Sequence, residues 1–271
     1  MSVHNDNVAR VTIPQLQKRA REGEKLVMLT CYDASFAKLC DDAGVEMLLI
    51  GDSLGNVIQG NDHTLAVTIE ETEYHTRAVA RGSHKALVIA DMPFGSFQES
   101  PQQAFRNAAR LLGAGAQMVK IEAAGHMVET TRFLVERGVP VCAHVGLTPQ
   151  SVHALGGHRV QGRGDEAADR LVADSKALAE AGAAIVLLEA VPNAVGKRVT
   201  EAVGVPTIGI GAGPDCSGQV LVLYDILDIY PGKKARFVKN FMAGQASVKD
   251  AVTAYVRAVK DKSYPAPEHC F

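Results

Sequence analysis

One pattern recurs along this chain: a polar segment of helical character ends at a glycine, and a short apolar run follows within a few residues. The glycines that carry the pattern are Gly44, Gly82, Gly115, Gly138, Gly182 and Gly204. Glycine tolerates the left-handed backbone at the end of a helix, and a short apolar run bounded by glycine is typical of a buried strand. Because parallel neighbours need a crossover connection, this rhythm predicts helices that alternate with parallel strands.

The apolar runs give eight expected strands, each followed by a helical segment or a loop. They are Leu26–Cys31, Met47–Ile50, Ala86–Ala90, Met118–Ile121, Val141–Ala143, Ala184–Leu188, Thr207–Ile210 and Val220–Leu223. Eight such units in about 250 residues are typical of a (β/α)8 barrel, whereas a doubly wound open sheet usually has fewer strands. We therefore expect an α/β fold of the TIM-barrel type and keep the open sheet as the alternative.

Helices are also expected near both ends of the chain. A short one should span about Ile13–Gly23, and an amphipathic one should span Ser247–Asp261. The apolar face of the second would be formed by Val248, Val252, Tyr255, Val256 and Val259. No low-complexity linker divides the chain, so we expect one domain over 1–271, with its core at about 24–243 and a C-terminal helix and tail at 244–271. The tail from Ser263 to Phe271 is expected to be poorly ordered unless an oligomer holds it.

Composition argues against several classes of function. The net charge of −2 gives no reason to expect a nucleic acid or an anionic membrane as a partner. Five cysteines without C-x-x-C spacing suit reduced thiols better than a disulfide framework. No apolar run approaches the ~20 residues that span a bilayer, and the first ten residues lack the pattern of a signal peptide. We therefore expect a cytoplasmic protein.

Ionisable side chains stand where most of the expected strands end. They are Asp52, Asp91, Lys120, Glu122, His144, Glu189 and Asp225. The carboxyl ends of the strands form the catalytic face of such a barrel. Any one of these acids, Asp225 for example, could instead cap a helix or lie in a loop. Packing alone does not explain why so many strands carry such a group at the same end, so we expect a functional site there.

Three of these carboxylates, Asp52, Asp91 and Glu122, form the core of the expected site. Converging carboxylates repel one another unless a cation lies among them. Ligation by oxygen alone favours a hard ion, Mg²⁺ first, over zinc or copper. Lys120 lies two residues before Glu122 on the same face of the strand, so it either faces a ligand or forms an ion pair with Glu122.

Histidines and glycines add weaker candidates. Only His144, which ends a strand, is expected at the site. Polar helices or loops are expected for His63, His75, His84, His126, His153 and His158. The run Gly209–Gly213 follows the seventh strand without dinucleotide-binding spacing, and it predicts either a pocket wall or a plain tight turn.

Seven short segments, taken in order, resemble the ketopantoate hydroxymethyltransferase (3-methyl-2-oxobutanoate hydroxymethyltransferase) family. They are Met28–Ser35, Ile50–Gly55, Ala90–Gly95, Val119–Glu122, His144–Ser151, Leu188–Pro192 and Gly209–Gly213. The segments span about Thr12–Ala243, so the resemblance is close to full length. It implies a (β/α)8 barrel that transfers a hydroxymethyl group from 5,10-methylenetetrahydrofolate to 3-methyl-2-oxobutanoate. The product is 2-dehydropantoate (ketopantoate), an intermediate of pantothenate biosynthesis.

The resemblance also implies roles for individual residues. Asp52 and Asp91 would ligate one Mg²⁺ per subunit, and Glu122 would complete the metal site. Glu189 would accept a proton. The expected substrate-binding residues are Asp52, Ser53, Asp91 and Lys120. We add His144 to this set because it ends a strand. The resemblance further implies a homodecamer.

The expected chemistry suits these groups. A 2-oxo acid chelates a hard cation through its keto oxygen and one carboxylate oxygen, and the cation stabilises the enolate that forms when C3 loses a proton. A carboxylate whose pKa is raised towards neutrality by apolar surroundings would take that proton. Glu189 follows Leu187 and Leu188 and so has that setting.

Two other functions remain open at this point. One is a Mg²⁺-dependent lyase or mutase acting on oxo acids, of the phosphoenolpyruvate-mutase and isocitrate-lyase type, which would need its own catalytic loop, often with a reactive cysteine. The other is a ligand-binding barrel without catalytic activity. The intact set of carboxylates and Lys120 argues against the second function.

Overall fold

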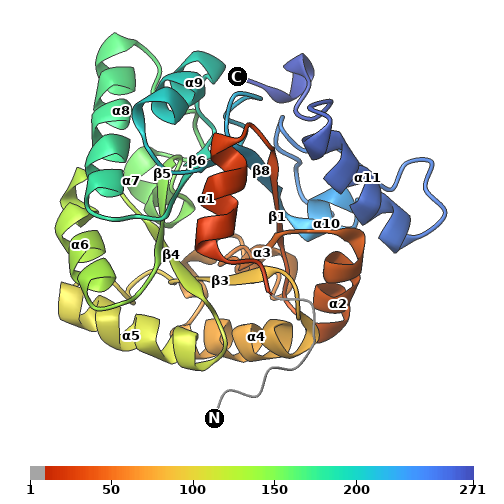
Figure 1. Cartoon of the computed structure of the whole chain (residues 1–271), viewed down its shortest axis with the longest axis horizontal. Coiled ribbons are helices and arrows are strands. Elements are labelled where there is room, and N and C mark those ends of the chain that lie inside the picture. The colour runs from red at the N-terminus through yellow and green to blue at the C-terminus, as the bar shows by residue number, and fades with distance from the viewer. Residues whose placement is uncertain (1–9) are drawn as a thin grey trace.

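The computed structural model describes residues 10–271, and the first nine residues of the expected domain lie outside this range. Eight parallel strands follow one another around a closed barrel in chain order (Figure 1). They are β1 (Leu26–Thr30), β2 (Met47–Ile50), β3 (Leu87–Asp91), β4 (Met118–Glu122), β5 (Val141–Gly146), β6 (Ile185–Glu189), β7 (Thr207–Ile210) and β8 (Gly218–Leu221). The barrel closes where β8 pairs with β1, so the predicted TIM barrel is confirmed and the open sheet is excluded.

Helices surround the barrel because each strand buries one face in the interior and the other beneath a helix. The longer helices are α1 (Ile13–Arg21), α2 (Ala34–Ala43), α4 (Ile69–Gly82), α5 (Pro101–Gly113), α6 (Val128–Glu136), α8 (Asp165–Glu180), α9 (Asn193–Ala202) and α11 (Val248–Lys260). Short helices are α3 (Leu54–Val57), α7 (Val152–Leu155) and α10 (Leu223–Ile226), with 3-10 turns at Thr64–Ala66, Gly125–Met127, Pro149–Ser151 and Pro267–His269. Within residues 10–271, none of the helices has the length and apolar character to cross a membrane.

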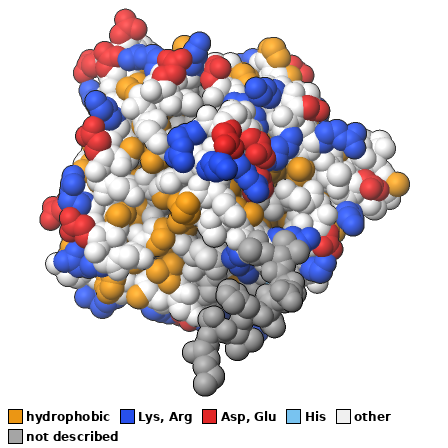
Figure 2. Space-filling view, in the orientation of Figure 1, with side chains coloured by type: hydrophobic (Ala, Val, Ile, Leu, Met, Phe, Trp, Pro, Cys, Tyr) orange, Lys and Arg blue, Asp and Glu red, His pale blue; other side chains and the backbone are white. Residues whose placement is uncertain are grey.

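One end of the barrel is covered by α1, which lies across the centre of the ring of helices in Figure 1. Arg19 of α1 pairs with Glu46 at 2.6 Å, and Lys260 of α11 pairs with Glu46 at 2.9 Å. Figure 2 shows side chains of both charges next to one another at the centre of this face. Glu46 directly precedes β2, so this network lies where the strands begin. The opposite end is therefore the one available for a site.

The last covering helix, α11, comes from the C-terminal part of the chain. Only the short α10 follows β8 directly, and α11 packs against α2 and β1. The hydroxyl of Tyr255 donates to the carbonyls of Met28 (2.9 Å) and Gln219 (3.2 Å), and so ties β1 to β8 where the barrel closes. The predicted apolar face of α11 is confirmed, since Val252, Tyr255 and Val259 are at most 1% exposed.

The expectation of a poorly ordered tail is wrong. Tyr264 is 2% exposed, and its hydroxyl donates to the carbonyl of Phe237 at 2.7 Å. Its ring packs edge-on against Phe241 and Tyr255. The tail therefore packs on an aromatic surface that the chain itself provides. That surface joins segments distant in sequence, so the tail's own sequence does not reveal it.

Two strands end two or three residues away from their predicted carboxyl ends. The pairing of β8 with β1 ends at Leu221, and the N–H of Leu223 donates to the hydroxyl of Thr30 at 2.9 Å. The predicted extension of β8 to Leu223 is therefore wrong, and Asp225 lies in α10. In contrast β5 continues to Gly146, because its pairing with β6 extends that far, and His144 lies within the strand rather than at its end.

The recurring glycines serve two purposes. Gly44, Gly115, Gly138 and Gly182 have φ values between 81° and 114°, so their left-handed conformation is as predicted. The prediction is wrong for Gly82 and Gly204, neither of which has a positive φ. Gly82 is the last residue of α4, and a Cβ built there would lie 2.2 Å from the carbonyl oxygen of Ala34 in α2. Glycine at that position therefore permits two helices to approach closely.

We expect Gly82→Ala to lower the free energy of unfolding by about 1–3 kcal/mol, because the added methyl group overlaps the backbone of α2. Gly113→Ala is the matched control. Gly113 also ends a helix, but a Cβ there meets nothing within 4 Å. This control should be neutral or stabilising by up to about 1 kcal/mol. Urea unfolding followed by circular dichroism measures both, and equal effects of the two substitutions would contradict the close approach.

Candidate active site

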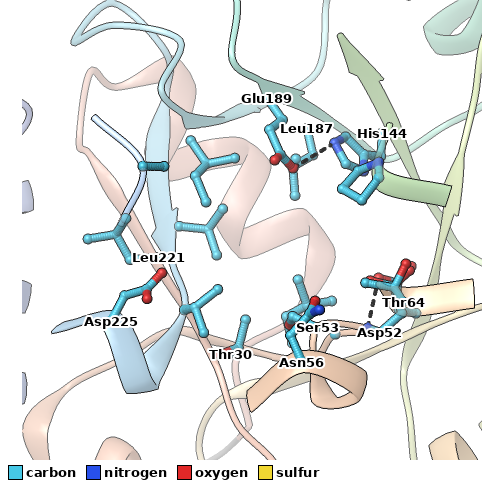
Figure 3. Close-up of a pocket in the computed structure, with 18 of the residues that line it drawn as sticks. Thr30, Asp52, Ser53, Asn56, Thr64, His144, Leu187, Glu189, Leu221 and Asp225 are labelled. Carbon is cyan, nitrogen blue, oxygen red and sulfur yellow. Dashed lines mark hydrogen bonds and ion pairs between the residues drawn. The ribbon is translucent and has the colours of Figure 1, made fainter. Parts of the chain in front are cut away.

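A cavity of about 210 Å³ lies at the carboxyl ends of the strands. The residues that the sequence predicted for the site all line it: Asp52, Ser53, Asp91, Lys120, Glu122, His144, Glu189 and Asp225. Figure 3 shows the side chains of Asp52 and Glu189 on opposite sides of this space, with His144 next to Glu189. The closed barrel thus brings together groups that are spread over more than 170 positions of the sequence.

A buried ion pair joins neighbouring strands in this cavity. Nζ of Lys120 lies 2.5 Å from Oδ2 of Asp91, and neither side chain is more than 5% exposed. The partner is Asp91 rather than Glu122, because Asp91 lies directly opposite Lys120 in the pairing of β3 with β4. Burial opposes the charge of Lys120, but the carboxylates of Asp91, Asp52 and Glu122 outweigh it and raise its pKa. Lys120 is therefore a permanent cation at physiological pH.

The carboxyl group of Asp91 has one oxygen without a partner. Burial raises its pKa to about 7 against the opposing charge of Lys120, and the neighbouring Asp52 adds to this increase. The backbone N–H of Asp52 donates to Oδ2 of Asp91 at 3.3 Å, but Oδ1 is buried and makes no hydrogen bond. A buried oxygen left unpaired is costly. Oδ1 therefore marks a position where a bound donor or cation would be stabilised.

Gln150 connects two of the predicted carboxylates, and sequence reasoning missed it. Its backbone N–H lies 3.0 and 3.2 Å from the two carboxylate oxygens of Glu122. Its side-chain amide donates to Oδ2 of Asp52 at 2.9 Å and to the carbonyl of Met92 at 3.0 Å. Gln150 is 4% exposed and lies in the turn after β5. Its only signal in the sequence was its place in the segment His144–Ser151.

The carboxylates of Asp52, Asp91 and Glu122 offer oxygen ligands for a metal ion. Within residues 10–271, no three His, Cys, Asp or Glu side chains are already gathered closely enough to chelate an ion. Mg²⁺, however, is usually held by one or two carboxylates together with water and substrate oxygens. Asp52 and Asp91, coupled through one hydrogen bond and offering a buried unpaired oxygen, fit that pattern. Burial followed by the charge of Asp52 raises the pKa of Glu122 well above its ordinary value, so Glu122 also lies where a cation would be favourable.

Glu189 lies apart from the other carboxylates. Burial raises its pKa to about 7 against the charge of Lys120. Oε2 of Glu189 lies 3.3 Å from Nε2 of His144, and neither ring nitrogen of His144 has a hydrogen-bond partner within the described chain. Burial, and then the charge of Lys120, lowers the pKa of His144 well below its ordinary value. The site therefore combines a carboxyl group that titrates near neutrality with a neutral imidazole.

The cavity is also lined by residues that the sequence did not place at the site. Of the histidines expected in polar loops or helices, two line it, His63 and His158. Further lining residues are Asn56 of the short helix α3, Thr64 of a 3-10 turn, and Tyr230 and Lys233 of a loop. The predicted glycine run contributes Ile210 to the wall. Loop residues carry no periodic pattern that would place them at a site, which explains why they were missed.

The family model and two curated relatives that match this chain all carry the name of one enzyme family. The family model of ketopantoate hydroxymethyltransferase matches residues 10–267. The chain is 64% identical over 262 residues to the 3-methyl-2-oxobutanoate hydroxymethyltransferase of Azoarcus sp. (strain BH72), covering 96% of this chain and 97% of that protein. Identity to the enzyme of the same name from Chromobacterium violaceum is 62% over 262 residues, covering 97% of this chain and 100% of that protein.

Solved structures that share the fold have more distant sequences. A 2,3-dimethylmalate lyase of the PEP mutase/isocitrate lyase superfamily has a TM-score of 0.58 and 17% identity, covering 77% of this chain and 80% of that one. The phosphoenolpyruvate phosphomutase from Streptomyces platensis subsp. rosaceus has a TM-score of 0.61 and 14% identity, covering 80% of this chain and 83% of that one. At such identities the similarity concerns the fold alone.

We expect Gln150→Leu to lower the free energy of unfolding by about 1–3 kcal/mol, since Asp52 and the carbonyl of Met92 lose a buried donor. The affinity for Mg²⁺ should fall about 10- to 100-fold, as is usual when a group that orients metal ligands is lost. Urea unfolding and titration calorimetry measure the two effects. Gln161→Leu, whose amide donates only to the carbonyl of Arg159, is the control. Unchanged values in Gln150→Leu would show that Gln150 does not position these carboxylates.

Proposed function

The chain belongs to the ketopantoate hydroxymethyltransferase family, and on that premise we propose that the cavity at the carboxyl ends of the strands is its active site. The enzyme transfers a hydroxymethyl group to 3-methyl-2-oxobutanoate in pantothenate biosynthesis, and its identity implies methylenetetrahydrofolate as the one-carbon donor. The observation that supports this site best is that Glu189 and Asp52 lie on opposite sides of one cavity (Figure 3), which Asp91 and Lys120 also line. The reaction needs those two parts: an anchor for the oxo acid and a distinct base.

Asp52 and Asp91 would hold Mg²⁺, and Glu122 would complete the site through water. The unpaired Oδ1 of Asp91 and the all-oxygen donor set support this assignment. A cation bound there would supply Lewis-acid chemistry by polarising the keto oxygen of the substrate. Asp52 and Asp91 are also the residues proposed to place the oxo acid, since a chelating 2-oxo acid occupies the positions that they leave open.

Lys120 and Ser53 would bind the substrate carboxylate. The buried ammonium group of Lys120 is a permanent charge, and Asp91 uses only part of its donor capacity. The hydroxyl of Ser53 lies 2.8 Å from that of Tyr32, so Ser53 is held towards the cavity. A charge-assisted hydrogen bond in such a dry site orients a carboxylate strongly.

Glu189 would remove the proton from C3 and leave that carbon nucleophilic towards the one-carbon unit. Its pKa of about 7 suits a base at physiological pH. His144, neutral and 3.3 Å from Glu189, would orient the carboxylate and contact the substrate. Ala190, the residue after Glu189, has a φ of 46°, and such left-handed backbone outside glycine is concentrated at functional sites.

The lyase or mutase alternative has no support beyond the shared fold. Such an enzyme would often use a reactive cysteine in a catalytic loop, and all five cysteines of this chain are free and buried. Burial also raises the pKa of Cys216 to about 11, which keeps that thiol protonated and unreactive. A homodecamer, which the family resemblance implies, and a cytoplasmic location, which was expected from the sequence, remain part of the proposal.

We expect Glu189→Gln to abolish exchange of the C3 proton of 3-methyl-2-oxobutanoate in deuterated buffer while Mg²⁺ still binds, because an amide cannot accept the proton. Proton NMR follows the exchange. Asp225→Asn is the matched control, since Asp225 lines the same cavity and burial raises its pKa to about 6. If Asp225→Asn lost the exchange and Glu189→Gln retained it, Asp225 would be the base instead.

The pH profile of that exchange gives a separate test. Only the ionised carboxylate of Glu189 accepts a proton, so the wild-type rate should rise about tenfold per pH unit below a pKa of about 7 and become constant above it. The charged and titratable groups that act on Glu189 are Lys120, Asp52, His158 and the neutral His144. The rate should be measured at saturating Mg²⁺ and oxo acid, so that Asp91 stays ionised. A rate that does not change between pH 5 and pH 8 would exclude Glu189 as the base.

Removing either proposed ligand tests the metal site. We expect Asp52→Ala or Asp91→Ala to eliminate the dependence of oxo-acid binding on Mg²⁺, because each substitution removes an oxygen ligand from a site with few of them. Calorimetric titrations with Mg²⁺ and with a chelator give the comparison. Asp225→Asn again serves as the control for a change of charge in the cavity. Retained dependence on Mg²⁺ in both alanine variants would disprove the assignment.

A further inference from the structure

A second cavity of about 620 Å³ lies beyond the inner one. The two are continuous, because Ser53, Glu189 and Lys233 line both. Small-molecule sites usually have volumes of ~300–1,000 Å³, a range that includes the outer cavity but not the inner one of about 210 Å³. The inner cavity therefore suits a small acid, and the outer cavity has room for a larger molecule that reaches the atoms next to Glu189.

Four basic side chains line this outer cavity, together with the acidic side chains of Asp62, Glu189 and Asp225. Its basic side chains are Arg159, Lys233, Lys234 and Arg236. Lys234 pairs with Asp228, and the guanidinium of Arg236 donates to the carbonyl of Glu268 at 3.0 Å. Within residues 10–271, neither Arg159 nor Lys233 takes part in an ion pair. These two cations, contributed by separate loops, are therefore available to a ligand.

Flat side chains line the same cavity, namely Tyr230, Phe237 and Phe271. The rings of Phe237 and Phe271 meet edge to face with centroids 6.5 Å apart, and the guanidinium of Arg236 lies 5.8 Å from the centroid of Phe271. A Cβ on Gly211 would come within 2.6 Å of Phe237 and 2.9 Å of Phe271, so glycine is needed for the rings to lie there. Aromatic rings beside free cations suit a ligand that combines a planar ring system with carboxylates.

We propose that the outer cavity binds the folate co-substrate, with its rings against Phe237, Tyr230 and Phe271 and its glutamate carboxylates on Arg159 and Lys233. This inference rests on the proposed function, because it takes the inner cavity as the site of the oxo acid. The one-carbon donor must bring its carbon to the substrate atom that faces Glu189, and the outer cavity is the adjoining space that Glu189 also lines. The pterin end therefore lies at the junction of the two cavities, and the anionic tail points outward to the cations.

The test uses the full enzyme with two donors, methylenetetrahydrofolate carrying one glutamate and the same donor carrying three. In the double variant Arg159→Gln/Lys233→Gln, the KM for the triglutamate donor should rise about 10- to 100-fold, which is the usual effect of losing charged hydrogen bonds. The advantage of the triglutamate over the monoglutamate donor should disappear. Exchange of the C3 proton needs no folate, so the single variant Arg159→Gln, whose side chain lines the outer cavity and not the inner one, should exchange at the wild-type rate. Arg170→Gln/Lys176→Gln, which changes one arginine and one lysine of α8 outside both cavities, is the matched control.

Each outcome decides the question. A KM within twofold of wild type in Arg159→Gln/Lys233→Gln, or an equal rise in the control, would overturn the folate assignment while normal exchange leaves the proposed function intact. Absence of exchange in the wild-type enzyme would instead refute the proposed function. The wild-type enzyme offers a measurement that needs no variant: added salt should raise the KM of the triglutamate donor more than that of the monoglutamate donor. An equal salt effect on the two donors would also count against binding of the tail by Arg159 and Lys233.

Discussion

The proposed active site depends on one buried ion pair, that of Lys120 with Asp91. Two opposite charges removed from water are costly unless they are paired and hydrogen-bonded, and these two lie opposite each other on adjacent strands with almost no exposure. The pair places a permanent cation in the same cavity as Asp52 and Glu122. It thereby offsets part of the repulsion among three carboxylates, and a divalent cation in the proposed site would offset more of it.

Chemically similar carboxyl groups in this cavity differ in their immediate neighbours. Burial raises the pKa of Asp91 and of Glu189 to about 7, and that of Glu122 well above its ordinary value. Asp91 is in direct contact with the cation Lys120, whereas Glu189 lies 3.3 Å from the neutral His144. A carboxyl group next to a cation is suited to binding a metal ion. A carboxyl group without a charged contact that titrates near neutrality is suited to proton transfer. The roles we propose follow from this difference in environment.

A similar contrast separates the inner and outer cavities. The inner one is small and formed largely by strand ends, while the outer one is formed by loops and by the end of the chain. Phe271, the last residue, reaches the outer cavity because Tyr264 and its aromatic neighbours hold the tail against the barrel. The C-terminal segment thus supplies α11, which supports the closure of the barrel, and also one wall of the cavity next to the site.

The sequence by itself determined the barrel and the convergence of Asp52, Asp91, Lys120, Glu122 and Glu189. Both follow from strand periodicity and from the rule that parallel strands place their carboxyl ends on one side. The partner of Lys120, the bridging role of Gln150, the extent of β8 and the packing of the tail were decided only by the tertiary structure. Each of these depends on contacts between segments far apart in the chain, and on register and loop conformation. Local sequence patterns determine which face a residue occupies, but they do not determine which distant residue will lie opposite it.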